Sequence, residues 1–259
     1  MITSLQNNKV KEVAKLSKSS VRNELSCTVV EGNREVSIAQ QFHFEIQTIF
    51  ICKSIFKDDE MYAINFECGA EIIEVSPDVY AKLSYRTGTE GILAIVKTKQ
   101  NTIHQLIATE NSLILVLESI EKPGNIGAML RTADAAGVNA IIICNKVTDV
   151  YNPNTIRSSL GCVFAMPIFT STSTECIDFL NKHNFQILCA SLQTENNFYA
   201  QNLKLNTAIV FGSESDGLSS IWYEKSTLVK LPMHGKIDSL NVSASCAAML
   251  FEAVRQKQN

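Results

Sequence analysis

Long apolar segments are missing from this sequence of 259 residues. Its wholly apolar runs are short, as at 113–117 and 140–144, whereas a helix that spans a bilayer needs about 20 apolar residues. Residues 1–8 also lack the apolar core of a signal peptide. We therefore expect a soluble, intracellular protein with no membrane partner. Because 46% of its residues are hydrophobic, the chain can still bury a sizeable core, which we expect to be divided between two modest domains.

Paired cysteine motifs are also missing. None of the eight cysteines forms a C-x-x-C pair, which is the spacing of many zinc sites. Several cysteines lie inside apolar runs, as Cys144 and Cys189 do, and buried free thiols are the simplest interpretation. We therefore expect no metal site and a reducing cytoplasm as the compartment.

The sequence contains no G-x-G-x-x-G, no G-x-x-x-x-G-K-[S/T] and no G-x-S-x-G motif. Dinucleotide-dependent enzymes, P-loop proteins and common hydrolases thereby lose their main sequence support. A nucleotide-dependent dehydrogenase stays open only as a minor alternative, which NAD binding would test.

Overall positive charge is missing too, since the net charge is −3 and the isoelectric point is near 5.9. This argues weakly against a nucleic-acid partner. The charge is uneven, however, because residues 1–22 are basic. Their charged residues are Lys9, Lys11, Lys15, Lys18 and Arg22, with Glu12 as the one acid. Such a segment is often only a solvated helix face, but it is also a candidate for contacts with phosphates.

Short apolar runs alternate with helical patterns in the second half of the chain. The predicted strands are 113–117, 140–144, 186–192, 208–211 and 228–231. Helices are predicted over 125–136, where Gly137 supplies a stop, and over 243–257. This alternation predicts an α/β domain with a parallel sheet that is covered on both faces. Ligands of such sheets bind beyond the carboxyl ends of the strands.

The first hundred residues have a different pattern and predict a small α/β module. Its predicted strands are 27–30, 46–50 and 92–96. Its predicted helices are 35–42 and 76–84. The polar segment that begins at 97–101 is the best candidate for a boundary. We therefore predict two domains, 1–107 with the linker included and 108–259.

Three clusters in the second domain carry polar groups that could serve chemistry. In the first, Pro123–Arg131, a strand gives way to a helix whose free N–H groups and glycines allow a ligand to approach closely. Asn125 could instead simply cap that helix, and Arg131 could be only a salt-bridge partner. The second cluster, Phe211–Ser219, is a glycine-rich loop after a strand in which Glu214 could accept hydrogen bonds.

The third cluster, Leu231–Ser245, runs from a strand into the final helix. Apolar and polar residues alternate in it, as expected for a site that binds a purine or a thioether. Each of the three clusters alone is ambiguous.

Taken together and in this order, the clusters resemble the three motifs of the SpoU/TrmH family of the SPOUT superfamily. The matching segments are Asn125-x-Gly127-x-x-x-Arg131, Phe211-Gly212-x-Glu214-x-x-Gly217-Leu218, Leu231-Pro232-Met233-x-Gly235 and Ser239-Leu240-Asn241-Val242-Ser243, with Ile156-Arg157-Ser158-Ser159-x-Gly161 between the first two. The resemblance is close over 113–257. It is looser at 30–36 and 91–96, which look like the substrate-binding domain of the family, a domain similar to certain ribosomal RNA-binding proteins.

The resemblance implies an S-adenosylmethionine-dependent RNA 2′-O-ribose methyltransferase, and nothing in the sequence suggests that it needs a metal. It also implies a deep trefoil knot near the C-terminus, although knots are almost absent from proteins, and a homodimer with active sites near the subunit interface. The implied catalytic residues are Arg131, Asn125, Glu214, Ser239 and Asn241. The implied cofactor-binding residues are Gly212, Gly217, Leu231, Met233 and Leu240.

For RNA binding, the expected contacts are Lys9, Lys11, Lys15 and Arg22 in the first domain and Arg157 on the catalytic domain. A separate RNA-binding domain favours 23S rRNA as the substrate, by analogy with the family alone. A tRNA 2′-O-methyltransferase and a non-catalytic RNA-binding protein of the same fold remain the alternatives. Binding of S-adenosylmethionine would argue against the second of these.

Arg131 has two possible roles in the implied reaction. A sulfonium is already a good electrophile, so the protein must mainly position it and manage the hydroxyl proton. The family assigns activation of the 2′-hydroxyl to Arg131. Because a guanidinium rarely releases a proton, we favour a clamp on the adjacent phosphate that also stabilises the developing alkoxide. Glu214 and Asn241 would orient Arg131 and the loops.

Overall fold

The computed structural model describes residues 1–57, 60–85 and 90–258. The chain forms two compact units, each of which is built from two separate segments. The first unit consists of Met1–Lys99 and Asp149–Ala165, and the second of Gln100–Thr148 and Met166–Asn259. The chain therefore leaves the second unit between two of its strands, adds a short segment to the first unit, and returns.

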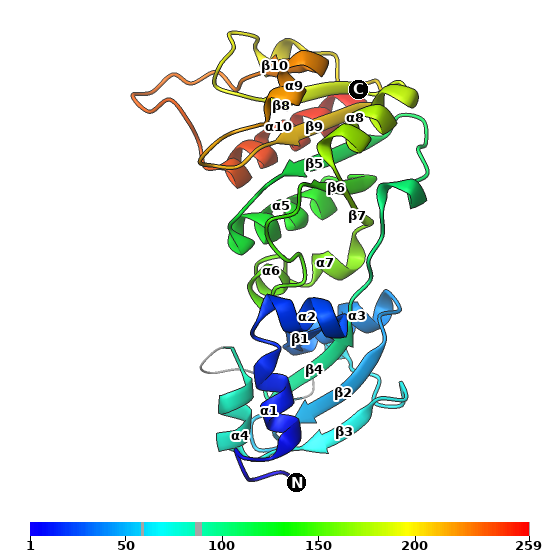
Figure 1. Cartoon of the computed structure of the whole chain (residues 1–259), viewed down its shortest axis with the longest axis vertical. Coiled ribbons are helices and arrows are strands. Elements are labelled where there is room, and N and C mark those ends of the chain that lie inside the picture. The colour runs from blue at the N-terminus through cyan, green and yellow to red at the C-terminus, as the bar shows by residue number, and fades with distance from the viewer. Residues whose placement is uncertain (58–59, 86–89, 259) are drawn as a thin grey trace. The chain divides into compact units, whose positions relative to one another are not determined.

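A four-stranded mixed sheet forms the centre of the first unit (Figure 1). Its strands are β1 (Cys27–Glu31), β2 (Ile46–Ile51), β3 (Glu71–Glu74) and β4 (Ile92–Lys97), in the order β1-β4-β2-β3. The central strand β4 is antiparallel to both β1 and β2, and β3 is parallel to β2. Strands β1, β2 and β4 confirm the predicted ones. The edge strand β3 was not predicted, because its two isoleucines are flanked by glutamates and show no alternation.

Helices cover this sheet and the termini of its strands. They are α1 (Asn8–Lys15), α2 (Ser19–Leu25), α3 (Asn33–Gln41), η1 (Glu60–Tyr62), α4 (Pro77–Leu83), α6 (Pro153–Ser158) and α7 (Cys162–Ala165). Val10 and Val13 of α1 pack with Tyr80 of α4 and with Phe50 of β2 in one apolar cluster. Since these two valines use one face of α1, Lys11 and Lys15 lie on its exposed side.

The sheet of the second unit has six strands, and every pair of neighbours is parallel. The strands are β5 (Leu113–Glu118), β6 (Ala140–Cys144), β7 (Ile168–Ser171), β8 (Gln186–Ala190), β9 (Thr207–Phe211) and β10 (Thr227–Val229), in the order β10-β8-β9-β5-β6-β7. The predicted parallel sheet is therefore confirmed. Strand β7 is the one that the sequence did not reveal.

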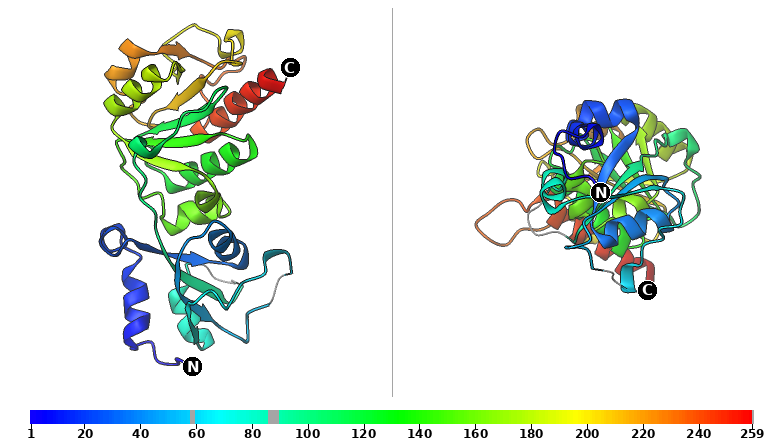
Figure 2. Two further views of the ribbon diagram at one scale, coloured as in Figure 1. Left: turned by 90° about the vertical axis from the view of Figure 1, so that its right-hand side faces the viewer. Right: turned by 90° about the horizontal axis from the view of Figure 1, so that it is seen from below.

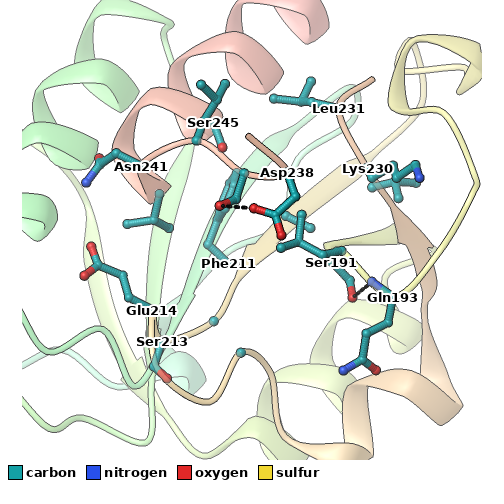
Figure 3. Close-up of a pocket in the computed structure, with 18 of the residues that line it drawn as sticks. Ser191, Gln193, Phe211, Ser213, Glu214, Lys230, Leu231, Asp238, Asn241 and Ser245 are labelled. Carbon is teal, nitrogen blue, oxygen red and sulfur yellow. Dashed lines mark hydrogen bonds between the residues drawn. The ribbon is translucent and has the colours of Figure 1, made fainter. Parts of the chain in front are cut away.

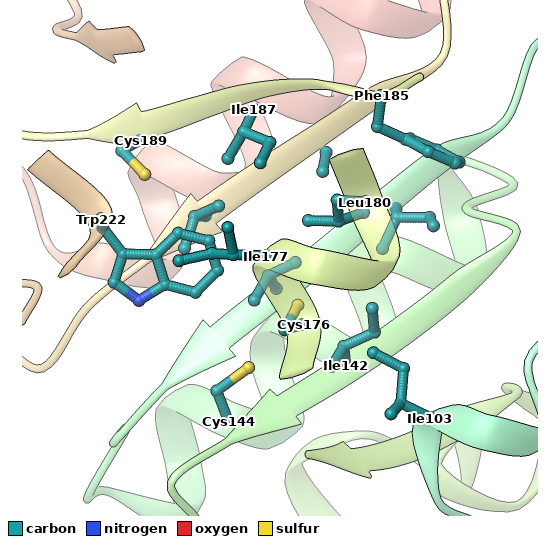
Figure 4. Packing of buried hydrophobic residues seen from close by; sticks show 14 of the residues in the cluster. Ile103, Ile142, Cys144, Cys176, Ile177, Leu180, Phe185, Ile187, Cys189 and Trp222 are labelled. Carbon is teal, nitrogen blue, oxygen red and sulfur yellow. The ribbon is translucent and has the colours of Figure 1, made fainter. Parts of the chain in front are cut away.

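Helices lie on both faces of this sheet. They are η2 (Ile103–Gln105), α5 (Pro123–Ala135), α8 (Ser173–Lys182), η3 (Phe198–Ala200), α9 (Ser220–Lys225) and α10 (Val242–Gln258). Helices α5 and α10 pack against each other on one face, and α8 and α9 lie on the other (Figure 2). A strand directs alternate side chains to opposite faces. Accordingly, Ile142, Cys144 and Cys189 point toward α8 and α9, around the buried Trp222 (Figure 4).

The ends of the two helices that bear predicted motifs agree with the sequence. Helix α5 ends at Ala135, and Gly137 beyond it has the left-handed φ of +64° that a helix stop of this type requires. Helix α10 begins one residue before its predicted start. Across the described residues, no helix is long and apolar enough to cross a membrane.

Candidate functional site

A cavity of about 640 Å³ lies at the carboxyl ends of β8, β9 and β10 (Figure 3). Its walls are the segments that follow these strands and the start of α10. Apolar side chains of the lining are Phe211, Leu231, Met233, Leu240, Val242 and Met249, and polar ones include Ser191, Gln193, Glu214, Ser239, Asn241 and Ser245. A volume of several hundred Å³ with a few polar groups on apolar walls suits a ligand of cofactor size.

The loop from Gly212 to Leu218 forms one wall and closes on itself. The Ser213 N–H donates to the Gly217 carbonyl over 3.0 Å, and the Gly217 N–H donates back to Ser213 over 3.1 Å. Gly217 has a φ of +70°, and a Cβ on Gly212 would lie only 2.2 Å from the Gly217 carbonyl oxygen. Both positions therefore need glycine, for a left-handed backbone in one case and for close packing in the other.

Three of the predicted catalytic residues meet beside this loop. The Asn125 side chain donates to the Glu214 carboxylate, and Asn241 Nδ2 donates to Asn125 Oδ1 over 3.4 Å. Asn125 is the third residue of α5, and its side chain does not cap that helix. Hence the segments after β5 and β9 and the start of α10 do converge, and capping no longer explains Asn125.

Lys122 completes this group, although no sequence pattern had selected it. Its ammonium forms an ion pair with the Glu214 carboxylate. Lys122 stands immediately before α5 and Glu214 lies in the loop after β9. Only the parallel pairing of β5 with β9 brings the two side chains together, so no local pattern could have indicated the contact.

The third cluster supplies the opposite wall and the start of α10. Asn241 precedes that helix, and its Oδ1 accepts from the Ser243 N–H at 2.9 Å and from Ser243 Oγ at 2.6 Å. This is the bonding of a helix N-cap. Ser239 also lines the cavity, where its hydroxyl donates to Asp238 over 3.3 Å. The cap thus fixes the amide of Asn241 where it reaches Asn125.

Arg131 lies apart from these residues. It is on α5, six residues after Asn125, which corresponds to roughly 9 Å along a helix axis. Its side chain is exposed and is not part of the cavity wall. Helix α5 nevertheless lies on the same face of the sheet as α10. The fold therefore places Arg131 on the correct side, but outside the group formed by Asn125, Glu214 and Asn241.

The predicted cofactor-binding residues fit a purine and thioether ligand. Gly212, Gly217, Leu231, Met233 and Leu240 all line the cavity. Among the described residues, no backbone N–H of 231–240 donates to another group of the chain, which leaves donors for a ligand. No group of three potential metal-binding side chains occurs in the part of the chain that the structure describes.

The predicted RNA contacts fall into two kinds. Lys11 and Lys15 are exposed on α1, whereas Lys9 is partly buried and pairs with Glu71. Arg157 is exposed at the end of α6, in the segment that packs with the first unit rather than the second.

Arg22, in contrast, is only 2% exposed. Its Nε donates to Asp149 over 2.7 Å, and its Nη1 donates to the carbonyls of Leu16 and Ser17. The prediction that Arg22 contacts RNA phosphates is therefore wrong, because the guanidinium is buried and used within the first unit.

The fold and the site define an α/β protein with a parallel sheet whose carboxyl edge holds a ligand of cofactor size. The profile of the SpoU rRNA Methylase family matches residues 112–251, and that of the MRM3-like substrate binding domain matches residues 7–94. The chain belongs to the SpoU rRNA methylase family.

Three similar proteins match this chain over nearly its full length. The chain is 26% identical to the 23S rRNA (guanosine(2553)-2′-O)-methyltransferase RlmP of Bacillus subtilis, over 96% of this chain and 97% of that protein. A solved RNA 2′-O ribose methyltransferase is 34% identical, with a TM-score of 0.88, and the match covers 100% of this chain and 99% of that one. The S-adenosylmethionine-bound rRNA methyltransferase of Sinorhizobium meliloti is 27% identical, with a TM-score of 0.89, over 98% and 97% of the two chains.

These findings confirm the predictions of fold class, enzyme class and cofactor. The chain is an RNA 2′-O-ribose methyltransferase of the SpoU/TrmH type that uses S-adenosylmethionine. The trefoil knot, the domain boundary at 107/108 and the roles of the individual site residues stay predictions.

Proposed function

We propose that this enzyme methylates a ribose 2′-hydroxyl of 23S rRNA, and that Asn125, Glu214 and Asn241 build its catalytic centre together with Arg131 and Ser239. The observation that carries the proposal is the meeting of these first three side chains beside the cavity wall. The choice of 23S rRNA is supported by the named substrate of the Bacillus subtilis relative and by the match to a substrate-binding domain. A tRNA substrate is the alternative that the experiments below address.

The cofactor, when bound in the cavity, supplies an electrophilic methyl group. Gly212, Gly217, Leu231, Met233 and Leu240 would hold it, through the glycine loop and the apolar walls. The residues of the chain must then bring the ribose hydroxyl into line and stabilise the charge that develops on its oxygen.

Arg131 is the candidate for the second task. Its guanidinium can form a two-pronged contact with the phosphate next to the reacting ribose, and can stabilise the alkoxide at the same time. Glu214 is held from two sides, by Lys122 and by Asn125. Glu214 would thereby hold Asn125 in a fixed position relative to the glycine loop.

The homodimer remains part of this proposal, and the exposed faces of α5 and α10 support it. On α10, Phe251 is 49% exposed and continues a row that begins with the exposed Ala244 and the partly exposed Ala247. Arg131 is exposed on the adjacent α5. If a second copy covers this surface, Arg131 would lie at the subunit interface, where it could complete the site of the partner. Sedimentation of the Phe251→Glu variant would test this, and an unchanged sedimentation coefficient would exclude the surface.

The role of Arg131 is tested by Arg131→Lys. We expect methylation to fall about a hundredfold, a loss of the size seen when one stabilising contact of a transition state is removed, while the affinity for S-adenosylmethionine stays unchanged in calorimetry. Lysine keeps the positive charge but lacks the planar fork. Near-full activity of this variant would exclude the clamp.

The substrate is tested with methyl-labelled cofactor and separate 23S rRNA and tRNA transcripts. The proposal expects label in 23S rRNA and a single site that resists alkaline cleavage, since a methylated 2′-oxygen cannot attack the neighbouring phosphate. Label in tRNA alone would assign the alternative substrate. Transfer of label to neither RNA would favour the non-catalytic alternative. A cytoplasmic location, where ribosomal RNA is available, belongs to the same proposal.

A further inference from the structure

A buried carboxylate lies behind the glycine loop, outside the residues that the proposed mechanism uses. Glu118 is the last residue of β5 and is 2% exposed. Its Oε2 accepts from the Ser219 N–H at 2.8 Å, and its Oε1 accepts from Ser219 Oγ at 2.7 Å. Oε1 also accepts from the Ser173 hydroxyl and, at 3.2 Å, from Asn145 Nδ2.

These partners come from three different segments of the second unit. Asn145 follows β6, Ser173 begins α8, and Ser219 directly precedes α9. The described residues include no Lys, Arg or His that forms an ion pair with Glu118, so neutral donors alone solvate its charge. A buried ion without such donors would strongly destabilise the fold.

Glu118 lies where it can fix the far end of the glycine loop. The near end is Phe211 of β9, which pairs with Leu117 of β5. The far end is Ser219, which Glu118 holds through the backbone and the side chain. The last two residues of β5 therefore anchor both ends of the 212–218 loop, the loop that presents Gly212 and Glu214 to the cavity.

We propose that Glu118 is a positioning residue for S-adenosylmethionine binding, because its carboxylate anchors Ser219 and thereby fixes the cavity wall at 212–218. The inference rests on the assignment of this cavity to the cofactor. An ionised carboxylate suits the place because it only accepts, and each of its recorded partners donates. A carboxamide would turn an N–H₂ group toward one of these donors.

The ionisation of Glu118 is consistent with this role. Burial raises the pKa of its carboxyl, but hydrogen bonds from Ser173 and Ser219 outweigh this effect, and the pKa lies below its ordinary value. The carboxylate therefore remains charged at neutral pH.

Three variants separate positioning from general stability. Glu118→Gln disrupts the whole cluster, Ser219→Ala removes one bond to the loop, and Ser173→Ala removes one bond on the α8 side, away from the loop. We expect the Kd for S-adenosylmethionine, measured by calorimetry, to rise at least tenfold in Glu118→Gln and about three- to fivefold in Ser219→Ala, in line with the usual worth of one or two hydrogen bonds.

The Ser173→Ala variant is the matched control. It should lower the melting temperature about as much as Ser219→Ala but change the Kd less than twofold. Ser219→Thr keeps the hydroxyl and should restore the affinity. Equal effects of Ser173→Ala and Ser219→Ala on the Kd would show a general loss of stability and overturn the proposal, even if Glu118→Gln fails to fold.

The failure of this inference can be told apart from the failure of the proposed function. If the unmodified protein binds S-adenosylmethionine and Glu118→Gln binds it equally well, Glu118 has no positioning role and the function stands. If the unmodified protein does not bind the cofactor at all, the assignment of the cavity is wrong, and the inference about Glu118 fails with it.

Discussion

The two sheets of this protein use their strand ends differently. In the second unit all six strands are parallel, so their carboxyl ends share one edge and the segments after β8, β9 and β10 line one cavity. In the first unit β4 is antiparallel to both of its neighbours, so consecutive loops leave from opposite edges. A parallel sheet gathers distant segments into one site, whereas a mixed sheet of this kind scatters them.

The comparison also explains why the two units use charge differently. The charged groups of the second unit's site, Lys122 and Glu214, hold each other. The first unit instead exposes Lys11 and Lys15 of α1 at its surface, where they can meet a polyanion, whereas Lys9 is partly buried and pairs with Glu71. We therefore expect site variants of the second unit to affect cofactor binding and surface variants of the first unit to affect RNA affinity.

The largest effect should come from Arg22→Met. This substitution removes the buried cation of the basic segment, residues 1–22. Removal of the guanidinium breaks the buried ion pair of Arg22 with Asp149, and we expect the free energy of unfolding of the first unit to fall by about 3–5 kcal/mol. Chemical denaturation measures this. The double variant Arg22→Met with Asp149→Leu should recover most of the loss, and Lys15→Ala should change stability by less than about 0.5 kcal/mol. A loss equally small for Arg22→Met would show that the ion pair does not hold the first unit together.

The next largest effect should come from Gly212→Ala, which changes the cavity wall of the second unit only. The added Cβ would lie 2.2 Å from the Gly217 carbonyl oxygen and must displace backbone. We expect the affinity for S-adenosylmethionine to fall about a hundredfold, or roughly 2.7 kcal/mol, with RNA affinity unchanged. Gly235→Ala is the control in the third cluster, since nothing lies within 4 Å of its Cβ position. Similar losses in the two variants would refute the steric argument.

The smallest effect should come from the triple change of Lys9, Lys11 and Lys15 to alanine. We expect RNA affinity to fall several-fold at moderate salt, and the dependence on salt to become shallower by about 0.7 to 0.9 per lost phosphate contact. Cofactor affinity should not change. The triple arginine variant keeps the charge and should bind like the unmodified protein. If the alanine variant keeps its affinity and its salt dependence, α1 does not contact RNA.

Much of the fold follows from local sequence patterns, and the rest depends on distant contacts. Buried strands such as β5 and β6 are apolar runs, so their places are evident from the sequence. The edge strand β3 and the short helices α6 and α7 lack both alternation and a long apolar face, and the sequence did not reveal them.

The site shows the same division. The glycine loop and the start of α10 were found because their residues stand together in the chain. The partners of Glu214 and Arg22 were not, because Lys122 is 92 residues from Glu214 and Asp149 is 127 residues from Arg22. Burial of a charged side chain depends on such a partner, and composition alone had suggested that Arg22 is exposed. The motif resemblance supplied roles that no local pattern could give.

Segment Asp149–Ala165, which returns to the first unit, limits how the protein can be cut into fragments. A fragment that stops at Lys99 would lack α6 and α7, the carbonyl of Tyr151 that accepts from Thr28 Oγ1 over 2.7 Å, and the counterion of Arg22. Such a fragment contains the whole four-stranded sheet, yet it would expose a lone cation and the surfaces that α6 and α7 cover. An autonomous first unit must therefore be made by splicing the returning segment back on, rather than by truncation.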